Sequence, residues 1–416
     1  MDATHSYPKL RWPLDIKLER IGDDELLVVR CPLGVSPEPL LLIAALAPVV
    51  IALDGSLSFQ QVLDKFSPVG LSEQLLSQLI EVLDSKLFLA NARFFAAEKQ
   101  MKAEFLALEV RPPAFAGRVY PASAGELSQL VDSYCALAPA RLEQNASAPE
   151  VLVAPHIDYR RGGKSYGKIY PELAANDVEV VFLLGTSHKY SKGLFQFTRK
   201  SFACPTGTLM TEKESIGRIA ARFGEKRAFE DEYLHKDEHS LELQVPFLAR
   251  FLPNATLVPI LVGSFHEMLP DGRNPSEFEE YESFVSAFVE ELSALSASGR
   301  RWCVVAGVDM AHVGRAFGDT GALTPEKMRE IASKDSEYLA AITSGNKDAL
   351  FRHVAEDLDA RRICGFPTMY TILDAMERLS ISLSGDVVDY SQAVDYTTDC
   401  AVTFAGVSLR SSPARG

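Results

Sequence analysis

VVAGVDMAHVG, residues 304–314, runs apolar for five positions and then presents Asp309 and His312. Two other stretches follow the same pattern: VLVAPHIDY (151–159) reaches His156 and VVFLLGTSHKY (180–190) reaches His188. Each begins with the branched and small apolar residues of a strand that is buried on both faces. A buried strand gains nothing from titratable groups at its end. The repeated pattern therefore predicts that several strand ends together form a functional edge.

Apolar strands alternate with amphipathic helices from about residue 111 onward. The predicted strands are 150–154, 179–185, 256–262, 302–308 and 400–409, and helices are predicted between them, for example at 124–138 and 276–295. This alternation is typical of a layered α/β domain with a largely parallel sheet, which we assign to residues 111–410. In such sheets ligands bind beyond the carboxyl ends of the strands, where the three histidines lie.

The first hundred residues have a different character. Helices such as the one carrying Leu75, Leu79, Val82 and Leu83 on one face, followed by a short strand at 86–94, predict a small winged-helix-like domain over 1–93. It resembles the PqqD-like peptide-recognition domains, which bind peptides along a strand edge. The alternative is a DNA-binding winged helix. Residues 1–100 carry 9 basic and 13 acidic residues, a net charge of −4, which favours a peptide or protein partner over nucleic acid. A connecting helix is predicted at 94–110.

The composition argues against a nucleic-acid-binding, membrane-spanning or secreted protein. The chain has 416 residues and a net charge of −14, which disfavours a phosphate-rich partner held by broad electrostatics. The apolar segment 40–53 is shorter than the about 20 residues a membrane span needs and contains Pro48, so we expect it in a core. Six cysteines without a CxxC pair, and no recognisable signal peptide, favour a reduced, cytoplasmic protein without membrane contact.

Three imidazoles at one edge of a sheet suit a transition metal such as iron, copper or zinc. The alternative is three unrelated loop histidines, each bonded to a backbone group. We predict that His156, His188 and His312 belong to one site. His235 and His353 are expected in polar surroundings outside it.

Two further segments add candidates to this site. KDEHSLELQVPFLARFL (236–252) predicts one helix with Asp237, Glu238 and His239 in its first turn. A helix N-terminus disfavours imidazole protonation, which suits a general base or a ligand, although the acids could equally form a capping turn. Cys364 precedes a predicted helix beside Arg361 and Arg362. Helix N-termini and nearby cations lower a thiol pKa and favour thiolate; the alternative is a buried structural cysteine.

Seven blocks occur in a characteristic order: RPPAFAGRVYP, VAPHIDY, LLGTSHKY, FACPTGTL, DEHSLELQVPFL, VDMAHVG and ICGFPTMYTIL. Together they resemble the MEMO-like protein family over about residues 111–410, a family similar in fold to class III extradiol dioxygenases. The resemblance implies that His156, His188 and Cys364 are metal ligands, with Asp309, His312 and His239 lining the pocket. It also implies bound iron or copper, redox chemistry, and radical-SAM and AMMECR-type partners in an AmmeMemoRadiSam system.

These observations lead to one main hypothesis and two alternatives. The main one is a metal-dependent, dioxygenase-like oxidoreductase whose metal is bound by His156, His188, Cys364 and His312. In it His239 moves protons, while His312 and Asp309 orient substrate or water. One alternative is a non-catalytic peptide- or protein-binding module using the same pocket. The other is a zinc-dependent hydrolase with a metal-activated water.

Overall fold

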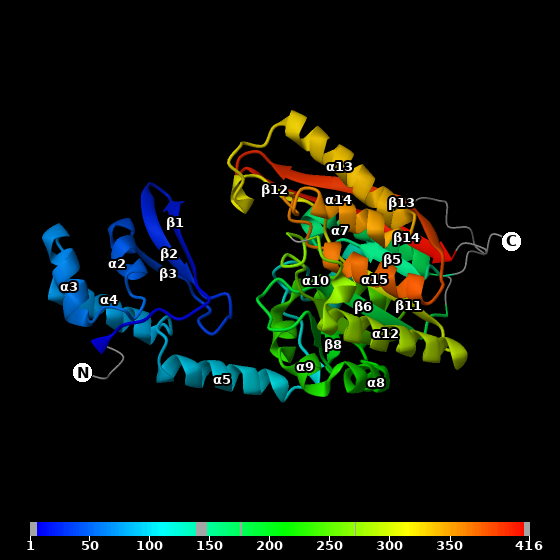
Figure 1. The fold of residues 1–416 in the computed structure, drawn as a ribbon, viewed down its shortest axis with the longest axis horizontal. Helices are drawn as coiled ribbons and strands as arrows, with labels where there is room; N and C mark the ends of the chain where they lie inside the picture. Colours follow the sequence, from blue (N-terminus) through cyan, green and yellow to red (C-terminus); the bar gives the residue numbers. More distant parts are fainter. Residues whose placement is uncertain (1–5, 139–147, 175–176, 271, 412–416) are drawn as a thin grey trace. The chain divides into compact units, whose positions relative to one another are not determined.

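The apolar runs that lead to the histidines form the middle of one sheet. The computed structural model describes residues 6–138, 148–174, 177–270 and 272–411. The strand order is β12-β14-β5-β11-β6-β10-β7, with β13 pairing β14. Among these strands, Figure 1 labels β12, β13, β14, β5, β11 and β6. The central strands are β5 (Val151–Ala154), β11 (Trp302–Gly307), β6 (Val180–Thr186) and β10 (Thr256–Val262). These four pair in parallel, so their carboxyl ends share one edge and the predicted largely parallel sheet is confirmed at its centre.

The outer strands run antiparallel to their neighbours. They are β7 (Phe195–Phe197), β12 (His312–Val313), β13 (Leu383–Asp395) and β14 (Cys400–Ser411). The predicted strand 400–409 is β14, which pairs antiparallel with β5, so the sheet as a whole is mixed. A separate small sheet consists of β4 (Val110–Arg111), β8 (Ser201–Cys204) and β9 (Gly207–Leu209).

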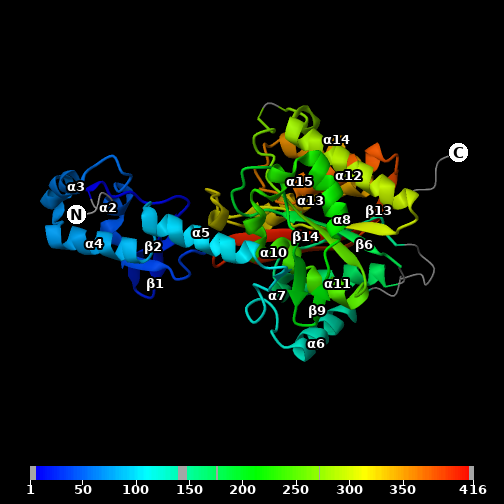
Figure 2. The ribbon, with the colours of Figure 1, turned by 90° about the horizontal axis from the view of Figure 1, so that it is seen from below.

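Helices cover both faces of the sheet, because successive side chains of each strand point to opposite faces. On β6, Phe182 and Leu184 belong to one buried cluster and Val181 and Leu183 to another. The first cluster is covered by α8 (Lys213–Phe223), α12 (Glu279–Ala297), α13 (Pro325–Thr343), α14 (Lys347–Ala355) and α15 (Phe366–Arg378). The second is covered by α6 (Ala124–Cys135), α7 (Tyr159–Ile169) and α11 (Val245–Phe251). Figure 2 shows these two sets of helices on opposite sides of the sheet.

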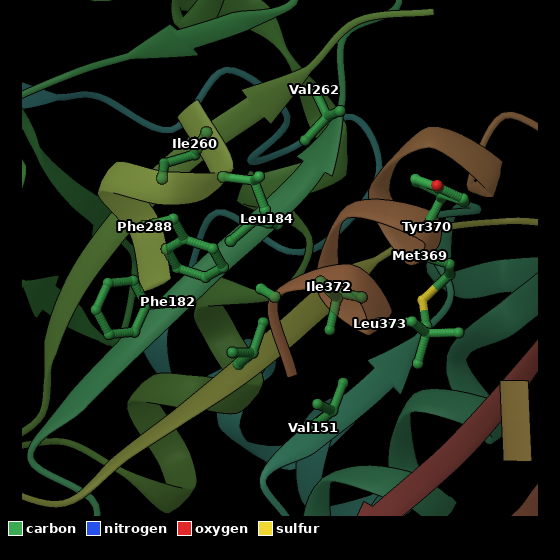
Figure 3. Close-up of a cluster of buried hydrophobic side chains, with 14 of the residues drawn as sticks. Val151, Phe182, Leu184, Ile260, Val262, Phe288, Met369, Tyr370, Ile372 and Leu373 are labelled. Atoms are coloured by element: carbon green, nitrogen blue, oxygen red, sulfur yellow. The ribbon is translucent and has the colours of Figure 1, made fainter. Parts of the chain in front are cut away.

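The core of the first layer shows why the strands hold their positions. In Figure 3, Phe182 and Leu184 of β6 lie beside Ile260 of β10 and Phe288 of α12. Each fully buried side chain of this size contributes about 1.5–3 kcal/mol to folding. A slip by one residue would move each of these side chains to the opposite face, where it would not fit the helices packed there, so the packing fixes the register and the place where each strand ends.

The single helix predicted over 236–252 is two helices in the structure. The first is α10 (His239–Glu242) and the second is α11, with Pro246 in its first turn. Proline has no backbone N–H to continue an earlier helix but fits the first turn of a new one. The break leaves α10 as a single turn that carries His239.

The N-terminal unit, residues 1–107, has its own core. An antiparallel sheet of β1 (Asp15–Ile21), β2 (Asp24–Arg30) and β3 (Leu40–Ile43) is followed by α2 (Ala47–Ile51), α3 (Phe59–Phe66), α4 (Glu73–Ser85) and α5 (Ala92–Leu106). Segment 40–53 supplies buried core residues, as predicted: Leu40, Leu46, Val49, Val50 and Leu53. None of the helices in the described ranges combines the length and the apolar character of a membrane span.

Three expectations for this unit differ from the structure. The antiparallel sheet precedes the helices, whereas a strand was expected after them, so the winged-helix arrangement is not confirmed. The strand predicted at 86–94 is wrong: it forms one isolated bridge, Leu10 with Leu89, and α5 begins at Ala92. Asn91 caps that helix by accepting a hydrogen bond from the backbone N–H of Phe94, which favours helix over strand here. On α4, Val82 is 38% exposed, and Leu76 and Ile80 take the buried positions.

Candidate metal centre

Three imidazoles converge at the carboxyl edge of the central strands. His156 follows β5, His188 follows β6, and His239 begins α10. One ring nitrogen from each lies within 4.8 Å of the other two. The ring centroids are 4.8 Å apart for His156 and His188, 5.1 Å for His156 and His239, and 4.3 Å for His188 and His239. This group could hold a metal ion.

Two of the imidazoles are oriented by hydrogen bonds at Nδ1, and Nδ1 of the third lies near the same carboxylate as one of them. His156 donates from Nδ1 to the carbonyl of Gly307 at 2.9 Å. His188 donates from Nδ1 to Oε1 of Glu238 at 2.9 Å, and Nδ1 of His239 lies 3.2 Å from the same oxygen. An acceptor at Nδ1 fixes the tautomer that leaves Nε2 with its lone pair, as metal-binding histidines require. Glu238 thus orients the His188 ring by a hydrogen bond and lies close to that of His239.

Cys364 lies against this group, just before α15. Its Sγ is 3.3 Å from Nε2 of His156 and 3.6 Å from the carbonyl of Asp309. Gly365 permits this approach, because a Cβ there would lie 2.6 Å from Cβ of Val308. The structure therefore brings His156, His188, His239 and Cys364 together.

The arginines beside Cys364 in the sequence do not act on its thiol. Arg361 pairs with Asp335 at 3.4 Å, and Arg362 pairs with Asp319 at 2.6 Å. Burial raises the pKa of Cys364, while a hydrogen bond with His188 opposes the rise. The expectation that the arginines lower this pKa is wrong, because both guanidinium groups are bonded to carboxylates.

Asp309 lies behind the group. It is 2% exposed, and its Oδ1 accepts hydrogen bonds from the backbone N–H groups of His156 at 2.9 Å and Ile157 at 3.3 Å. Its Oδ2 is 3.7 Å from Nε2 of His156. Burial raises the pKa of Asp309 to about 7, more than the two backbone donors lower it. This carboxyl group can therefore hold or release a proton near neutral pH.

His312 lies at the side of the centre rather than among the three converging rings. It begins β12, and its Nδ1 donates to the carbonyls of Met310 and Arg362, both at 3.1 Å. Burial lowers its pKa to about 4, so the ring is neutral at pH 7. Charge on His188 lowers that pKa further, which indicates that the two rings interact electrostatically.

The pKa values of the three converging rings differ because their surroundings differ. Burial and the neighbouring imidazoles hold the pKa of His156 well below its usual value and lower that of His239 to about 4. Burial also opposes charge on His188, but Glu238 and Cys364 outweigh it and raise this pKa to about 10. A metal requires neutral imidazole, so binding would displace the His188 proton.

The motif that opens the α/β unit holds the ligand segment in place. Arg111 is fully buried and pairs with Glu242 of α10 at 2.6 Å. It also donates to the carbonyls of His235 and Glu238. Glu242 further accepts hydrogen bonds from the backbone of residues 114 and 115 and from a tyrosine hydroxyl. The ring of Phe115 consequently lies 5.9 Å from that of His239.

Two glycines at strand ends let α10 come close to the sheet. A Cβ at Gly307 would lie 2.3 Å from the carbonyl oxygen of Ser240, and one at Gly185 would lie 2.7 Å from the Ser240 hydroxyl. Backbone at 2.3 Å cannot be displaced cheaply, so Gly307 sets how near His239 lies to His156.

A cavity of about 240 Å³ borders the centre, with His188 and Cys364 in its wall. The loop after β10 adds Phe265 and His266, and the segment before α15 adds Asp359. His266 therefore also follows a central parallel strand, but sequence reasoning did not select it. The signal was present, because VPILVGSFH repeats the pattern of an apolar run leading to a histidine.

Other placements differ from expectation or were not anticipated. His235, expected in polar surroundings, is 1% exposed, and its Nε2 donates to the carbonyl of Gln196. The sequence left two interpretations of Glu238 open, a helix cap and a residue of the site. Both apply, because Glu238 caps α10 by accepting from the N–H of Ser240 and also accepts from Nδ1 of His188. The role of Arg111 could not be predicted from the sequence around it, because its ion-pair partner Glu242 lies 131 residues away in the chain.

A sequence model of the Memo-like protein family matches residues 111–408. The chain belongs to the Memo-like protein family. A MEMO1 family protein of Aquifex aeolicus is 25% identical over 403 residues, covering 96% of this chain and 99% of that protein. A second Aquifex aeolicus member is 27% identical over 304 residues, covering 73% of this Memo-like chain and 99% of the relative. The protein memo-1 homolog of Caenorhabditis elegans is 25% identical over 295 residues, 70% of this chain and 77% of its own.

These relatives differ in how much of this chain they match. The relatives that match about 70% of the chain correspond in extent to the α/β unit that carries the candidate metal centre. The first Aquifex aeolicus protein extends the similarity over most of the N-terminal unit as well. The N-terminal unit is therefore shared with at least one other Memo-like protein.

Proposed function

We propose that this Memo-like protein binds iron or copper at His156, His188, His239 and Cys364 and uses it in oxidoreductase chemistry. The observation that supports the proposal best is the set of three imidazole nitrogens within 4.8 Å, with a thiol 3.3 Å from one of them. Imidazole and thiolate donors suit iron, copper and zinc, whereas magnesium and calcium prefer oxygen donors. A bound iron or copper ion would supply one-electron redox chemistry that no amino-acid side chain here provides.

The surrounding residues would manage protons and orientation. Asp309, with a pKa of about 7 and an oxygen 3.7 Å from the His156 ring, is suited to proton transfer near neutral pH. His312 is neutral at pH 7 and would orient a substrate or water by hydrogen bonding. His239, predicted to move protons, is assigned here to the donor set because its ring nitrogen converges with the other two.

Metal analysis of protein purified anaerobically from its native host tests the proposal. We expect about one iron or copper per chain in the wild type, and loss of that metal in His188→Ala with the fold retained. Cys135→Ser, on α6, is the matched control and should keep the metal. Zinc in place of iron or copper would favour the hydrolase. No metal, together with peptide affinity, would favour the binding module.

For the N-terminal unit we propose a peptide or protein partner that adds to the sheet edge. β3 is an edge strand, and its Leu41 and Ile43 are 47% and 56% exposed. An apolar sheet edge is a common site for pairing with an extended peptide. A radical-SAM or AMMECR-type protein remains the partner predicted from the family resemblance. Tight binding of duplex DNA by the N-terminal unit at low salt would contradict this proposal.

A further inference from the structure

The cavity beside the metal centre is placed to receive a substrate. It lies between the loops that follow β6 and β10 and the segment that precedes α15, and its volume is about 240 Å³. His188 and Cys364 are part of its wall, so a molecule in the cavity would contact the donor set directly. The volume lies below the roughly 300–1,000 Å³ of pockets that take drug-sized ligands, which indicates a small ligand.

Part of the wall is apolar. Phe265 and Phe366 are each 1% exposed, and their ring centroids are 6.1 Å apart at an angle of 84°. Ile363 and Leu269 complete this part of the lining. Buried aromatic and aliphatic walls favour a ligand with an apolar body, and aromatic faces also attract cations.

One lining carboxylate has no cationic partner. Asp359 accepts a hydrogen bond from the backbone N–H of Ile363 at 2.8 Å. Among the residues described in the structure, no lysine, arginine or histidine nitrogen lies within 4.0 Å of its carboxylate. The two nearest arginines in the chain, Arg361 and Arg362, are bonded to Asp335 and Asp319. Burial raises the pKa of Asp359 to about 6, so the group is still mainly ionised at pH 7.

The charges of Arg361 and Arg362 lower the pKa of Asp359, but both arginines form their ion pairs with other carboxylates. His188 shares its proton with Glu238 at 2.9 Å, and the guanidinium of Arg362 also donates to the carbonyl of His312. His266 is exposed at the rim. A half-buried carboxylate that has no cationic group of the described residues within 4.0 Å favours a ligand that brings its own positive charge.

We propose that this cavity binds a small organic amine, with its ammonium group paired to Asp359 and its apolar body against Phe265 and Phe366. The inference rests on the proposed function, because it assigns the substrate class of the same metal centre. Placement of the amine at Asp359 directs the rest of the molecule along a wall that contains His188 and Cys364. The pairing selects amines over neutral or anionic molecules of the same shape.

Calorimetric titration of the full-length, metal-free chain with benzylamine, benzyl alcohol and benzoate tests this inference. The metal-free chain is used because an amine could otherwise bind the metal itself. We expect benzylamine to bind at least about tenfold more tightly than benzyl alcohol, and benzoate to bind most weakly. Equal affinity for amine and alcohol, or tighter binding of benzoate, would overturn the inference without any variant.

Asp359→Asn then tests the named carboxylate. Asparagine keeps an oxygen for the N–H of Ile363, so the local turn should survive while the preference for benzylamine over benzyl alcohol disappears. Glu356→Gln, a nearby exposed acid outside the cavity, should keep the preference. Retention of the preference in Asp359→Asn would overturn the assignment. Metal content is measured separately: amine selectivity without metal binding refutes only the metal function, and metal binding without amine selectivity refutes only this inference.

Discussion

Arg111 and Glu242 form an ion pair of 2.6 Å in which neither side chain is exposed. The pair joins the first residues of the α/β unit to the helical turn that carries His239. Because Arg111 also donates to the carbonyls of His235 and Glu238, it fixes the backbone of Glu238 and of the segment that precedes it. The candidate metal centre therefore depends on a residue that never contacts it.

Arg111→Met should destabilise the protein by about 3–5 kcal/mol, because it leaves Glu242 buried without its cation. Urea denaturation followed by circular dichroism measures the free energy of unfolding. The control is Arg250→Met, which removes an ion pair with Asp132 that is 55% exposed on both sides and should cost at most about 1 kcal/mol. If both variants lost a similar amount of unfolding free energy, burial would not explain the effect of the Arg111 substitution.

Glu238→Gln should weaken metal binding by about 10- to 100-fold, because a neutral amide orients the His188 and His239 rings less strongly. Competition with a chelator of known affinity measures the change. Asp237→Asn is a close control, since that neighbouring acid pairs with Lys189 instead. If both substitutions weakened binding equally, the effect would be one of local charge and not of ring orientation.

His235→Gln should reduce the pH dependence of stability in the metal-free chain. Burial lowers the pKa of His235 to about 3, so between about pH 6.5 and pH 3 the unfolded chain binds a proton that the folded chain excludes. The contribution of His235 to the free energy of unfolding therefore falls as the pH falls through that window, by about 1.4 kcal/mol per pH unit. Denaturation midpoints measured from pH 4 to 6 should show a shallower slope for the variant. Above pH 7.5 the two curves should run parallel, and a slope unchanged by the substitution would refute the prediction.

Gly307→Ala should impair both folding and metal affinity, because its Cβ would lie 2.3 Å from the carbonyl oxygen of Ser240. Displacement of α10 would move His239 away from His156, whose Nδ1 also depends on the Gly307 carbonyl. Gly217→Ala, in the middle of α8 with no atom within 4 Å of the new Cβ, should raise stability by about 1 kcal/mol. Thermal unfolding and metal titration of the two variants check both outcomes.

The sequence predicted the structure best where a local pattern of residues also determines where those residues lie in the fold. The four buried parallel strands were predicted from short apolar runs, and the parallel arrangement then placed His156 and His188 at one edge. Contacts between segments that are distant in the chain were harder to predict from the sequence. The sequence suggested His239 as a proton carrier, but its convergence with the other rings depends on the Pro246 break and on glycines that admit α10. Adjacent residues also misled, since Arg361 and Arg362 stand beside Cys364 in the chain but are bonded to Asp335 and Asp319.

The position of β14 has a consequence for how the protein is made. This strand follows every candidate ligand in the chain, yet it lies between β12 and β5 in the sheet and pairs His312 with Val402. All four donors are therefore synthesised before β14, the strand that pairs with both β12 and β5. Until then β5 lacks a neighbour on that side, and β12 has no strand to pair with. Folding of the metal centre must finish after translation of nearly the whole described chain, and truncation before residue 400 should yield a chain with every ligand and no assembled site.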